Sequence, residues 1–169
     1  MTAHLENFPL TFWGEDKSTS ARFEISDVLP PIDQITSCFV LPIYRGRIVM
    51  VKAPRGWGFP GGHREVSEQP EDCIRREALE EASIELGSLT LIGYWKAIKE
   101  FDSPFNQKYP PIAYQLFYLS EVSSLLPFVG IYETKERALI TPEELKKIHQ
   151  NYDSIEYIMK FVYDNYLLS

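Results

Sequence analysis

Apolar residues follow two spacings along the chain, and these spacings predict where strands and helices lie. Nearly continuous apolar runs at residues 35–44 and 48–51 predict two buried strands, joined by a turn at Arg45-Gly46. Aromatic-rich runs at residues 89–98 and 112–119 predict two more strands, and residues 10–13 and 22–25 predict short ones. Between them, glycines and prolines at residues 53–62 predict a loop.

Helices are predicted by their start signals and by helical spacing of apolar residues. Pro70, followed by Glu71 and Asp72, fits the first turn of a helix over about residues 70–84. The run Thr141-Pro142-Glu143-Glu144 has the pattern of a capping box and predicts a second helix start. We expect Ser154 to cap a last amphipathic helix that carries Ile155, Ile158, Val162 and Leu167. Strands interleaved with helices in this order imply a mixed α/β layered domain.

Length and composition restrict the class of protein. A chain of 169 residues with 44% hydrophobic residues can form one domain with a real core. A net charge of −7 argues against binding duplex nucleic acid, which requires a basic surface. Cys38 and Cys73 are predicted to be reduced core residues. Neither a signal peptide nor a membrane-spanning apolar run is recognisable, so we expect a cytoplasmic protein.

Three glutamates share one face of the predicted helix at residues 70–84. Glu77, Glu80 and Glu81 are spaced three and four residues apart, and Glu77 and Glu81 repel each other at that spacing. Such a face requires a countercharge. Mg²⁺ is a natural candidate, because it binds one or two carboxylates together with substrate phosphates.

The spacing of charged residues around this helix resembles the Nudix box. That motif has glycine, five residues, glutamate, seven residues, and then Arg-Glu-aliphatic-x-Glu-Glu-x-Gly-aliphatic. Seven positions match it, with Ala78 in the first aliphatic place: Gly62, Glu68, Arg76, Glu77, Glu80, Glu81 and Ile84. Two serines depart from it, because Ser83 replaces the box glycine and Ser67 replaces a glycine that many members have. Since serine adopts positive φ less readily than glycine, the helix could end differently, running on toward Gly87.

The resemblance implies a fold and an activity. The expected fold is an α/β/α sandwich with a mixed β-sheet, in which the box forms a loop–helix–loop. The expected reaction is hydrolysis of a diphosphate bond with Mg²⁺ or Mn²⁺ as cofactor. By matching positions, Glu77, Glu80 and Glu81 would be metal ligands, together with a backbone carbonyl at Gly61 or Gly62. Glu77 would also be a candidate general base, and Arg76 would pair with Glu68. The alternative is a solvated helix face held by Asp72–Arg76 and Arg76–Glu80 pairs.

Residues outside the box are weaker candidates for binding substrate. Arg55 could contact a phosphate, and Trp57 and Phe59 could stack on a base, although large aromatics also belong to cores. His63 and Tyr109 are candidates by position, the latter within a long loop at residues 99–111. Glu133 or Glu136 could supply a further carboxylate, or could simply belong to a charged surface loop.

Two segments of the chain are expected. Residues 1–34 form an N-terminal extension packed on a Nudix-like hydrolase domain at residues 35–169. The extension and the last helix either add to the domain or form the surface of a homodimer. The expected substrate is a small nucleotide, either a nucleoside diphosphate derivative or a nucleoside triphosphate. The alternative function is a catalytically silent Nudix-fold sensor that binds a nucleotide metabolite.

Overall fold

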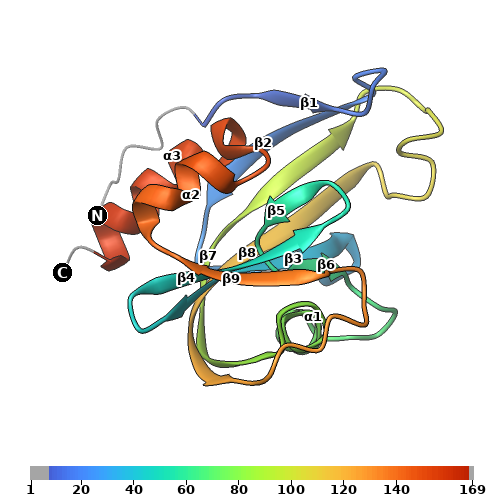
Figure 1. Cartoon of the computed structure of the whole chain (residues 1–169). Coiled ribbons are helices and arrows are strands. Elements are labelled where there is room, and N and C mark those ends of the chain that lie inside the picture. Colours follow the sequence, from blue (N-terminus) through green and yellow to red (C-terminus); the bar gives the residue numbers. More distant parts are fainter. Residues whose placement is uncertain (1–7, 168–169) are drawn as a thin grey trace.

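The computed structural model describes residues 8–167, which form one mixed β-sheet with helices on both faces (Figure 1). The strands are β1 (Thr11–Trp13), β2 (Thr19–Ile25), β3 (Ile35–Tyr44), β4 (Arg47–Ala53), β5 (Gly56–Gly58), β6 (Gly61–His63), β7 (Ile84–Lys99), β8 (Ile112–Leu125) and β9 (Glu136–Ile140). The helices are η1 (Ile32–Gln34), α1 (Pro70–Ala82), α2 (Pro142–Ile148), α3 (Tyr152–Val162) and the π-helical turn η2 (Tyr163–Leu167). No helix of the described residues has the length and apolarity needed to cross a membrane.

The order of the strands is β1-β2-β7-β8-β3-β4-β5, with β6 also paired to β3 and β9 to β4. β3 and β8 run parallel, whereas the other pairs between named strands are antiparallel. The predicted mixed sheet is therefore present. The N-terminal strands β1 and β2 extend it, because β2 pairs along its whole length with β7.

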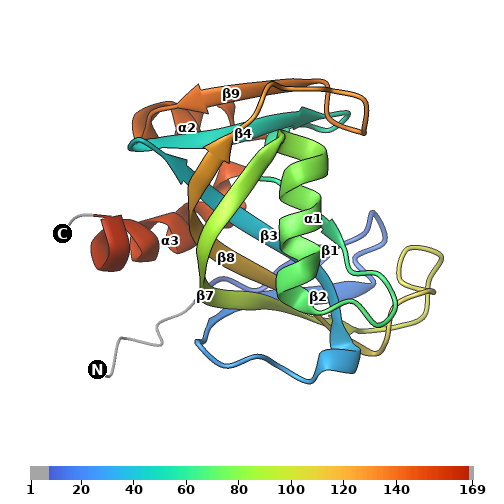
Figure 2. The same ribbon diagram turned by 90° about the horizontal axis from the view of Figure 1, so that it is seen from below.

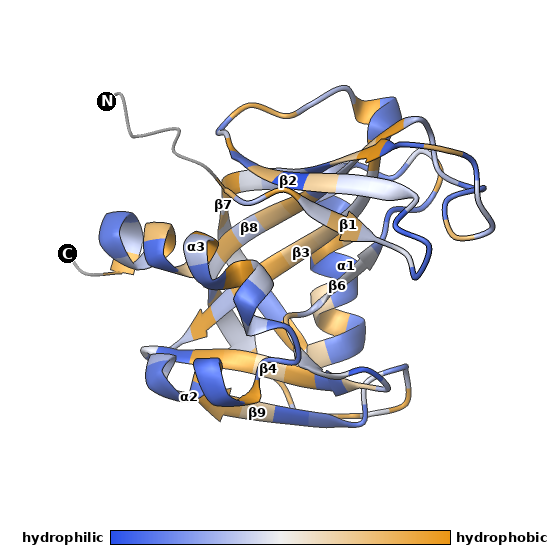
Figure 3. Cartoon of the chain, turned by 90° about the horizontal axis from the view of Figure 1, so that it is seen from above, coloured by the Kyte–Doolittle hydropathy of each residue, from blue (hydrophilic) through white to orange (hydrophobic). Residues whose placement is uncertain are grey.

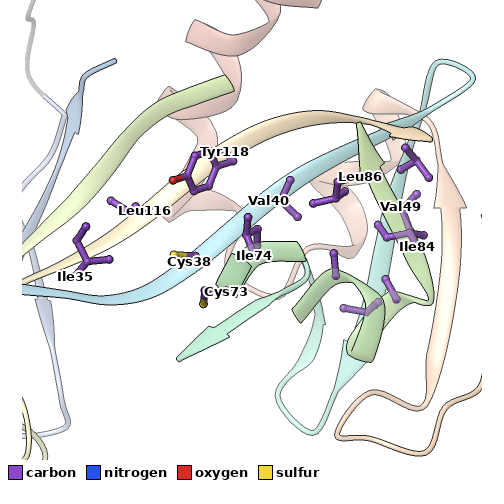
Figure 4. Packing of buried hydrophobic residues seen from close by; sticks show 14 of the residues in the cluster. Ile35, Cys38, Val40, Val49, Cys73, Ile74, Ile84, Leu86, Leu116 and Tyr118 are labelled. Atoms are coloured by element: carbon purple, nitrogen blue, oxygen red, sulfur yellow. The ribbon is translucent and has the colours of Figure 1, made fainter. Parts of the chain in front are cut away.

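Alternating side chains of β3 divide the core between the two faces of the sheet. Cys38 and Val40 belong to the cluster under α1, whereas Leu41 and Ile43 belong to the cluster under α2 and α3. Figure 4 shows Cys38 and Cys73 close together between β3 and α1, where both are buried free thiols as predicted. Figure 2 shows α1 and α3 on opposite sides of the sheet, which confirms the predicted α/β/α sandwich.

The hydropathy of the chain follows these layers. In Figure 3, strands β3 and β8 are hydrophobic where α3 crosses them, whereas the outer surface of α2 is largely hydrophilic. Four side chains of α3 are buried, and they lie at helical spacing: Ile155, Ile158, Met159 and Val162. The period of the apolar residues therefore reports directly which side of each helix meets the sheet.

Strand predictions differ from the structure mainly in length. The strand predicted at residues 35–44 matches β3, but β7 and β8 run longer than predicted. The segment at residues 53–62 is not only a loop, because it contains β5 and the start of β6. Both are three-residue strands built around glycines. Glycine is disfavoured in strands, and here their pairing with β4 and β3 overrides that preference.

Helix α1 ends earlier than predicted. It stops at Ala82, and Ser83 adopts the left-handed conformation at φ 53°, so the helix does not reach Ile84 or run on toward Gly87. Serine occupies this conformation because its neighbours hold it there: its hydroxyl oxygen accepts a hydrogen bond from the Val129 N–H at 3.3 Å. Residue 84 instead begins β7.

The two C-terminal helices confirm one predicted start and correct the other. Thr141 and Glu144 form the predicted capping box of α2. The N-cap of α3 is Asn151 rather than Ser154, whose hydroxyl donates to the Asn151 carbonyl within the first turn. Leu167 lies beyond α3, in the π-helical turn. Serine competes with the backbone for hydrogen bonds inside a helix as well as at its start, which makes the two positions hard to distinguish from sequence.

Candidate active site

Arg76 of α1 ties the helix to the loop that precedes it. Its Nε and Nη2 donate to the two carboxylate oxygens of Glu68 at 2.8 and 3.1 Å, a bidentate ion pair that agrees with the predicted pairing. Its Nη2 also donates to the His63 carbonyl at 3.1 Å. Glu68 in turn accepts from the Glu65 N–H and closes the loop on itself. Arg76 therefore fixes the position of the glycine-rich segment relative to the helix.

Arg76 also holds two of the three box glutamates. Its Nη1 lies 3.0 Å from Oε1 of Glu77 and 3.3 Å from Oε2 of Glu80. The Arg76–Glu80 pair of the solvated-face alternative is thus present, but it belongs to a cluster in which one guanidinium serves three carboxylates. The Arg76 side chain is only 25% exposed. This partly buried network therefore differs from an isolated, exposed ion pair, which contributes little to stability.

The third glutamate, Glu81, is held by backbone instead of a cation. Its Oε2 accepts the N–H of Gly61 at 3.0 Å, so the helix and the glycine-rich segment contact each other directly. At the next residue the approach is equally close, because a Cβ on Gly62 would lie 2.5 Å from Oε1 of Glu77. Residue 62 must therefore be glycine, because the Glu77 carboxylate occupies the space that a Cβ would need.

Burial and hydrogen bonding shift the pKa values of these carboxyls. Burial raises the pKa of Glu81 to about 7, opposed by the Gly61 N–H and reinforced by the negative charge of Glu77. Burial also raises the pKa of Glu77, although Arg76 acts in the opposite direction. The hydrogen bonds from Arg76 keep the pKa of Glu68 below its ordinary value. The helix face thus holds buried carboxyls whose charged forms are only partly compensated.

These residues suit a hard divalent cation by their chemistry. No three His, Cys, Asp or Glu side chains of residues 8–167 already converge on one point in the geometry of a bound ion, since Glu77 and Glu80 turn to Arg76 and Glu81 turns to Gly61. The donor set nevertheless consists of carboxylate oxygens, which such cations prefer, and a cation would neutralise the part of their charge that remains uncompensated. The Gly62 carbonyl, one of the two predicted backbone ligands, receives a long contact of 3.9 Å from the Cys73 thiol.

Glu133 and Glu136 occupy different environments. The charge of Glu133 acts on Glu81, where it contributes to the raised pKa. Glu136 instead lies on β9 opposite Lys52 of β4 and accepts from its ammonium at 2.9 Å. Of the two, Glu133 is therefore the carboxylate whose charge raises the pKa of Glu81.

A cavity of about 560 Å³ adjoins the box at Gly62 and His63. This volume falls in the usual range of small-molecule sites. Its floor is one face of β3, β7 and β8, including Ser37, Ala97 and Gln115. Its rim comes from four separate segments: the β1–β2 hairpin, residues 55–63, the loop at residues 100–111 and the start of α3. Figure 1 shows that hairpin and loop side by side at the same end of the sheet.

Four of the five predicted substrate contacts outside the acidic residues line this cavity: Arg55, Phe59, His63 and Tyr109. Phe59 packs against Phe117 and His149, with ring centroids 5.7 and 5.1 Å apart. His63 and Tyr109 stack at 10° and share a hydrogen bond of 3.0 Å between Nε2 and the phenol oxygen, which links the long loop to the box.

Trp57 lies elsewhere. It packs on the core under α3, Lys52 lies over its ring at 5.9 Å, and it does not line the cavity. This position corresponds to the core alternative for the large aromatics.

Several lining residues were missed by sequence reasoning: Trp13, Trp95, Lys99, Gln115 and His149. Burial lowers the pKa of His149 to about 4, so this side chain is neutral at physiological pH. Trp95 and Lys99 lie at alternate positions of one strand, which is the signal that they share a face. The alternation does not show, however, which face of the sheet remains uncovered by helices.

The chain is similar to a known family of domains. The sequence model of the NUDIX domain matches residues 34–161. None of the curated protein sequences matches this chain significantly.

Solved structures share the fold. A mutant form of the pyrophosphohydrolase BsRppH from Bacillus subtilis aligns with a TM-score of 0.68 at 22% identity, over 88% of this chain and 94% of that one. A NUDIX hydrolase from Nitrosomonas europaea aligns with a TM-score of 0.57 at 18% identity, over 76% and 87%. The NUDIX domain of Shewanella oneidensis NrtR, solved with ADP-ribose, aligns with a TM-score of 0.58 at 12% identity, over 76% and 86%. With its domain match covering most of the chain and its box carboxylates in place, the protein belongs to the Nudix family.

Proposed function

We propose that this protein hydrolyses a diphosphate bond in a small nucleotide, either a nucleoside diphosphate derivative or a nucleoside triphosphate, with a divalent cation as cofactor. One observation carries the proposal: the acidic helix and the cavity share Gly62, which lies directly against the Glu77 carboxylate on one side and lines the cavity on the other. A ligand in the cavity can therefore present a phosphate to the carboxylates.

Glu77, Glu80 and Glu81 would hold the cation, together with a backbone carbonyl at Gly61 or Gly62. When bound, Mg²⁺ or Mn²⁺ would neutralise phosphate charge and lower the pKa of bound water. The binding of a cation among these residues would offset the part of their buried charge that Arg76 and the Gly61 N–H do not compensate.

The residues of the chain contribute orientation and proton transfer. Arg76 keeps Glu77 and Glu80 in fixed positions and ties them to the loop at Glu68. Glu77 and Glu81 are the two candidate general bases, because their raised pKa values bring proton acceptance closer to neutral pH. Phe59 and the stacked His63–Tyr109 pair would orient the nucleoside part of the substrate.

The test is phosphate release from a panel of nucleoside triphosphates and nucleoside diphosphate derivatives, with Mg²⁺, Mn²⁺ or EDTA, coupled to a phosphatase where the product requires it. We expect turnover with a cation and none with EDTA. Glu81→Gln should reduce kcat by roughly 100-fold or more, the scale of losing a metal ligand or a base. Glu71→Gln is the matched control, because Glu71 is exposed on the first turn of the same helix.

Two results would overturn the proposal. Full turnover by Glu81→Gln would contradict its assignment to the metal site. No turnover of any compound by folded protein that still binds a nucleotide would establish the sensor instead of the hydrolase.

A further inference from the structure

The cavity carries a different charge from the rest of the molecule. The chain has a net charge of −7 and 24 acidic residues. Among the described residues that line the cavity, however, Arg55 and Lys99 are charged and no aspartate or glutamate is present. The carboxylates of the site lie beyond Gly62, on α1. The cavity itself therefore favours an anionic ligand.

Lys99 is the less exposed of these two cationic residues. It is the last residue of β7, two positions beyond Ala97 and four beyond Trp95, so all three lie on the face that forms the floor. Its side chain is only 17% exposed. Its carboxylate partner, Asp102, lies 3.5 Å away and is 94% exposed, so water competes for that pair. A lysine whose side chain is largely buried and whose ion-pair partner is this exposed retains most of its capacity to bind an anion.

The surroundings of Lys99 hold it in place. Trp13, Lys99, Phe105 and Asn106 form what we call the far wall of the cavity. Asn106 is 2% exposed, and its amide donates to the Ser18 carbonyl, the Thr19 hydroxyl and the Phe101 carbonyl. The loop at residues 100–111 is thereby fastened to the β1–β2 hairpin, and Thr19 is the register partner of Lys99.

The second contact between loop and hairpin is steric. A Cβ on Gly14 would lie 2.9 Å from the Phe105 ring, so the hairpin turn and the aromatic side chain touch without a gap. Hydrogen bonds and close packing between the loop and the hairpin therefore fix the far wall in position.

The far wall lies well away from the acidic helix. β6, which carries Gly62, pairs with β3, which pairs with β8, which pairs with β7. Three strand spacings correspond to roughly 14 Å, and Lys99 lies further along β7 than the strand position level with Gly62. One phosphate group cannot contact both places. An anion at Lys99 must be a different group from the diphosphate at the box.

We propose that Lys99 binds a second phosphate, carried on the nucleoside part of the ligand and remote from the diphosphate that is cleaved. The ligand class is a nucleotide with a phosphate monoester on its ribose. This inference rests on the proposed function only in placing the diphosphate at the box; the anion subsite itself is a property of the far wall.

The test measures binding without hydrolysis. Titration calorimetry in EDTA compares the 5′-monophosphates of adenosine and guanosine with their 2′,5′- and 3′,5′-bisphosphates. We expect at least one bisphosphate to bind about ten-fold more tightly than its monophosphate, the effect of one charge-assisted contact. Lys99→Gln should remove this difference, and Lys99→Arg should keep it. Lys96→Gln is the matched control, because Lys96 lies on the opposite face of the same strand and does not line the cavity.

The remaining outcomes also decide the question. Equal affinity for mono- and bisphosphates, a difference that persists in folded Lys99→Gln, or no binding of any of these nucleotides would overturn the anion subsite. Which bisphosphate binds more tightly identifies the ribose position. A preference that depends on Lys99, seen in a protein that hydrolyses no nucleotide with Mg²⁺ or Mn²⁺, would refute the hydrolase and leave the subsite standing.

Discussion

The hydroxyl oxygen of Ser83 accepts a hydrogen bond from the backbone N–H of Val129, and Ser83 itself stands in the left-handed region at φ 53°. Beside it, Arg137 donates to the carbonyls of Ala82 and Leu126, both at 2.8 Å. The last turn of the box helix is thus capped by residues that are distant in sequence. Serine replaces the motif glycine here because its side chain compensates for the backbone conformation that glycine adopts freely.

Ser83→Ala should lower the free energy of unfolding by about 1 kcal/mol, because the Val129 N–H loses its acceptor while the left-handed conformation remains. Ser67→Ala is the matched control: Ser67 also has positive φ, at 66°, but it is exposed and no side-chain hydrogen bond of its hydroxyl is present in the described residues. Urea denaturation of both variants checks the prediction. Equal losses would show that the hydroxyl contributes nothing.

Arg76→Lys should reduce kcat/KM by roughly ten-fold or more, because a lysine cannot reproduce the fork that holds Glu68 while also reaching Glu77. Steady-state kinetics over a range of Mg²⁺ concentrations is the measurement, and we expect the dependence on metal to shift to higher concentration. Arg75→Lys is the matched control. Arg75 is the neighbouring arginine on the same helix, and it donates to the Leu86 and Gly87 carbonyls instead of to the box glutamates. If both variants behave alike, the effect lies in helix stability and not in the orientation of the box carboxylates.

Local spacing was enough to predict one half of the contacts in the candidate site, those among Glu68, Arg76 and Glu77. One loop and one helix set the positions of Glu68, Arg76 and Glu77. A sequence that matches the spacing of the motif is therefore expected to form the same contacts among these residues. The capping box at Thr141 was predictable for the same reason, since both of its hydrogen bonds lie within four residues.

The other half depends on pairing between distant strands. Lys99 reaches the far wall only because β7 pairs with β2 in the register that sets it opposite Thr19. Likewise, Glu136 pairs with Lys52 through the register of β9 on β4. A register shift of one residue would move each side chain to the other face of the sheet, and nothing in a single strand fixes that choice.

The stability of the protein should fall between pH 6.5 and pH 4 through His149. Burial lowers its pKa to about 4 in the folded state, and its Nδ1 accepts the Asn151 N–H at 3.0 Å, which requires the neutral ring. In this range the unfolded chain binds a proton that the folded chain does not, so stability is full above pH 6.5 and decreases as the pH falls.

The comparison of wild type with His149→Gln isolates this effect from that of the other titrating groups. The wild type should lose on the order of 1 kcal/mol more than the variant between these two pH values, since partial exposure of the ring reduces the full linkage effect. Free energies of unfolding at several pH values provide the measurement. Parallel curves for the two proteins would contradict a half-buried, neutral His149.

Trp13→Ala should raise KM for the nucleotide substrate roughly ten-fold while leaving kcat nearly unchanged, because the side chain lines the cavity yet lies far from the acidic helix. Trp13 packs on Ala21 and Ala97 and contacts Trp95, with ring centroids 5.9 Å apart, so it offers a fixed aromatic surface. Phe12→Ala is the control, since Phe12 is the preceding residue of the same strand, points to the opposite face and is 51% exposed. A fall in kcat at constant KM would place Trp13 among residues that act on the chemical step. Unchanged KM in both variants would exclude the β1–β2 hairpin from substrate binding. The split between KM and kcat is decisive because a residue that only stabilised the sheet would affect the amount of folded enzyme and not its apparent affinity for substrate.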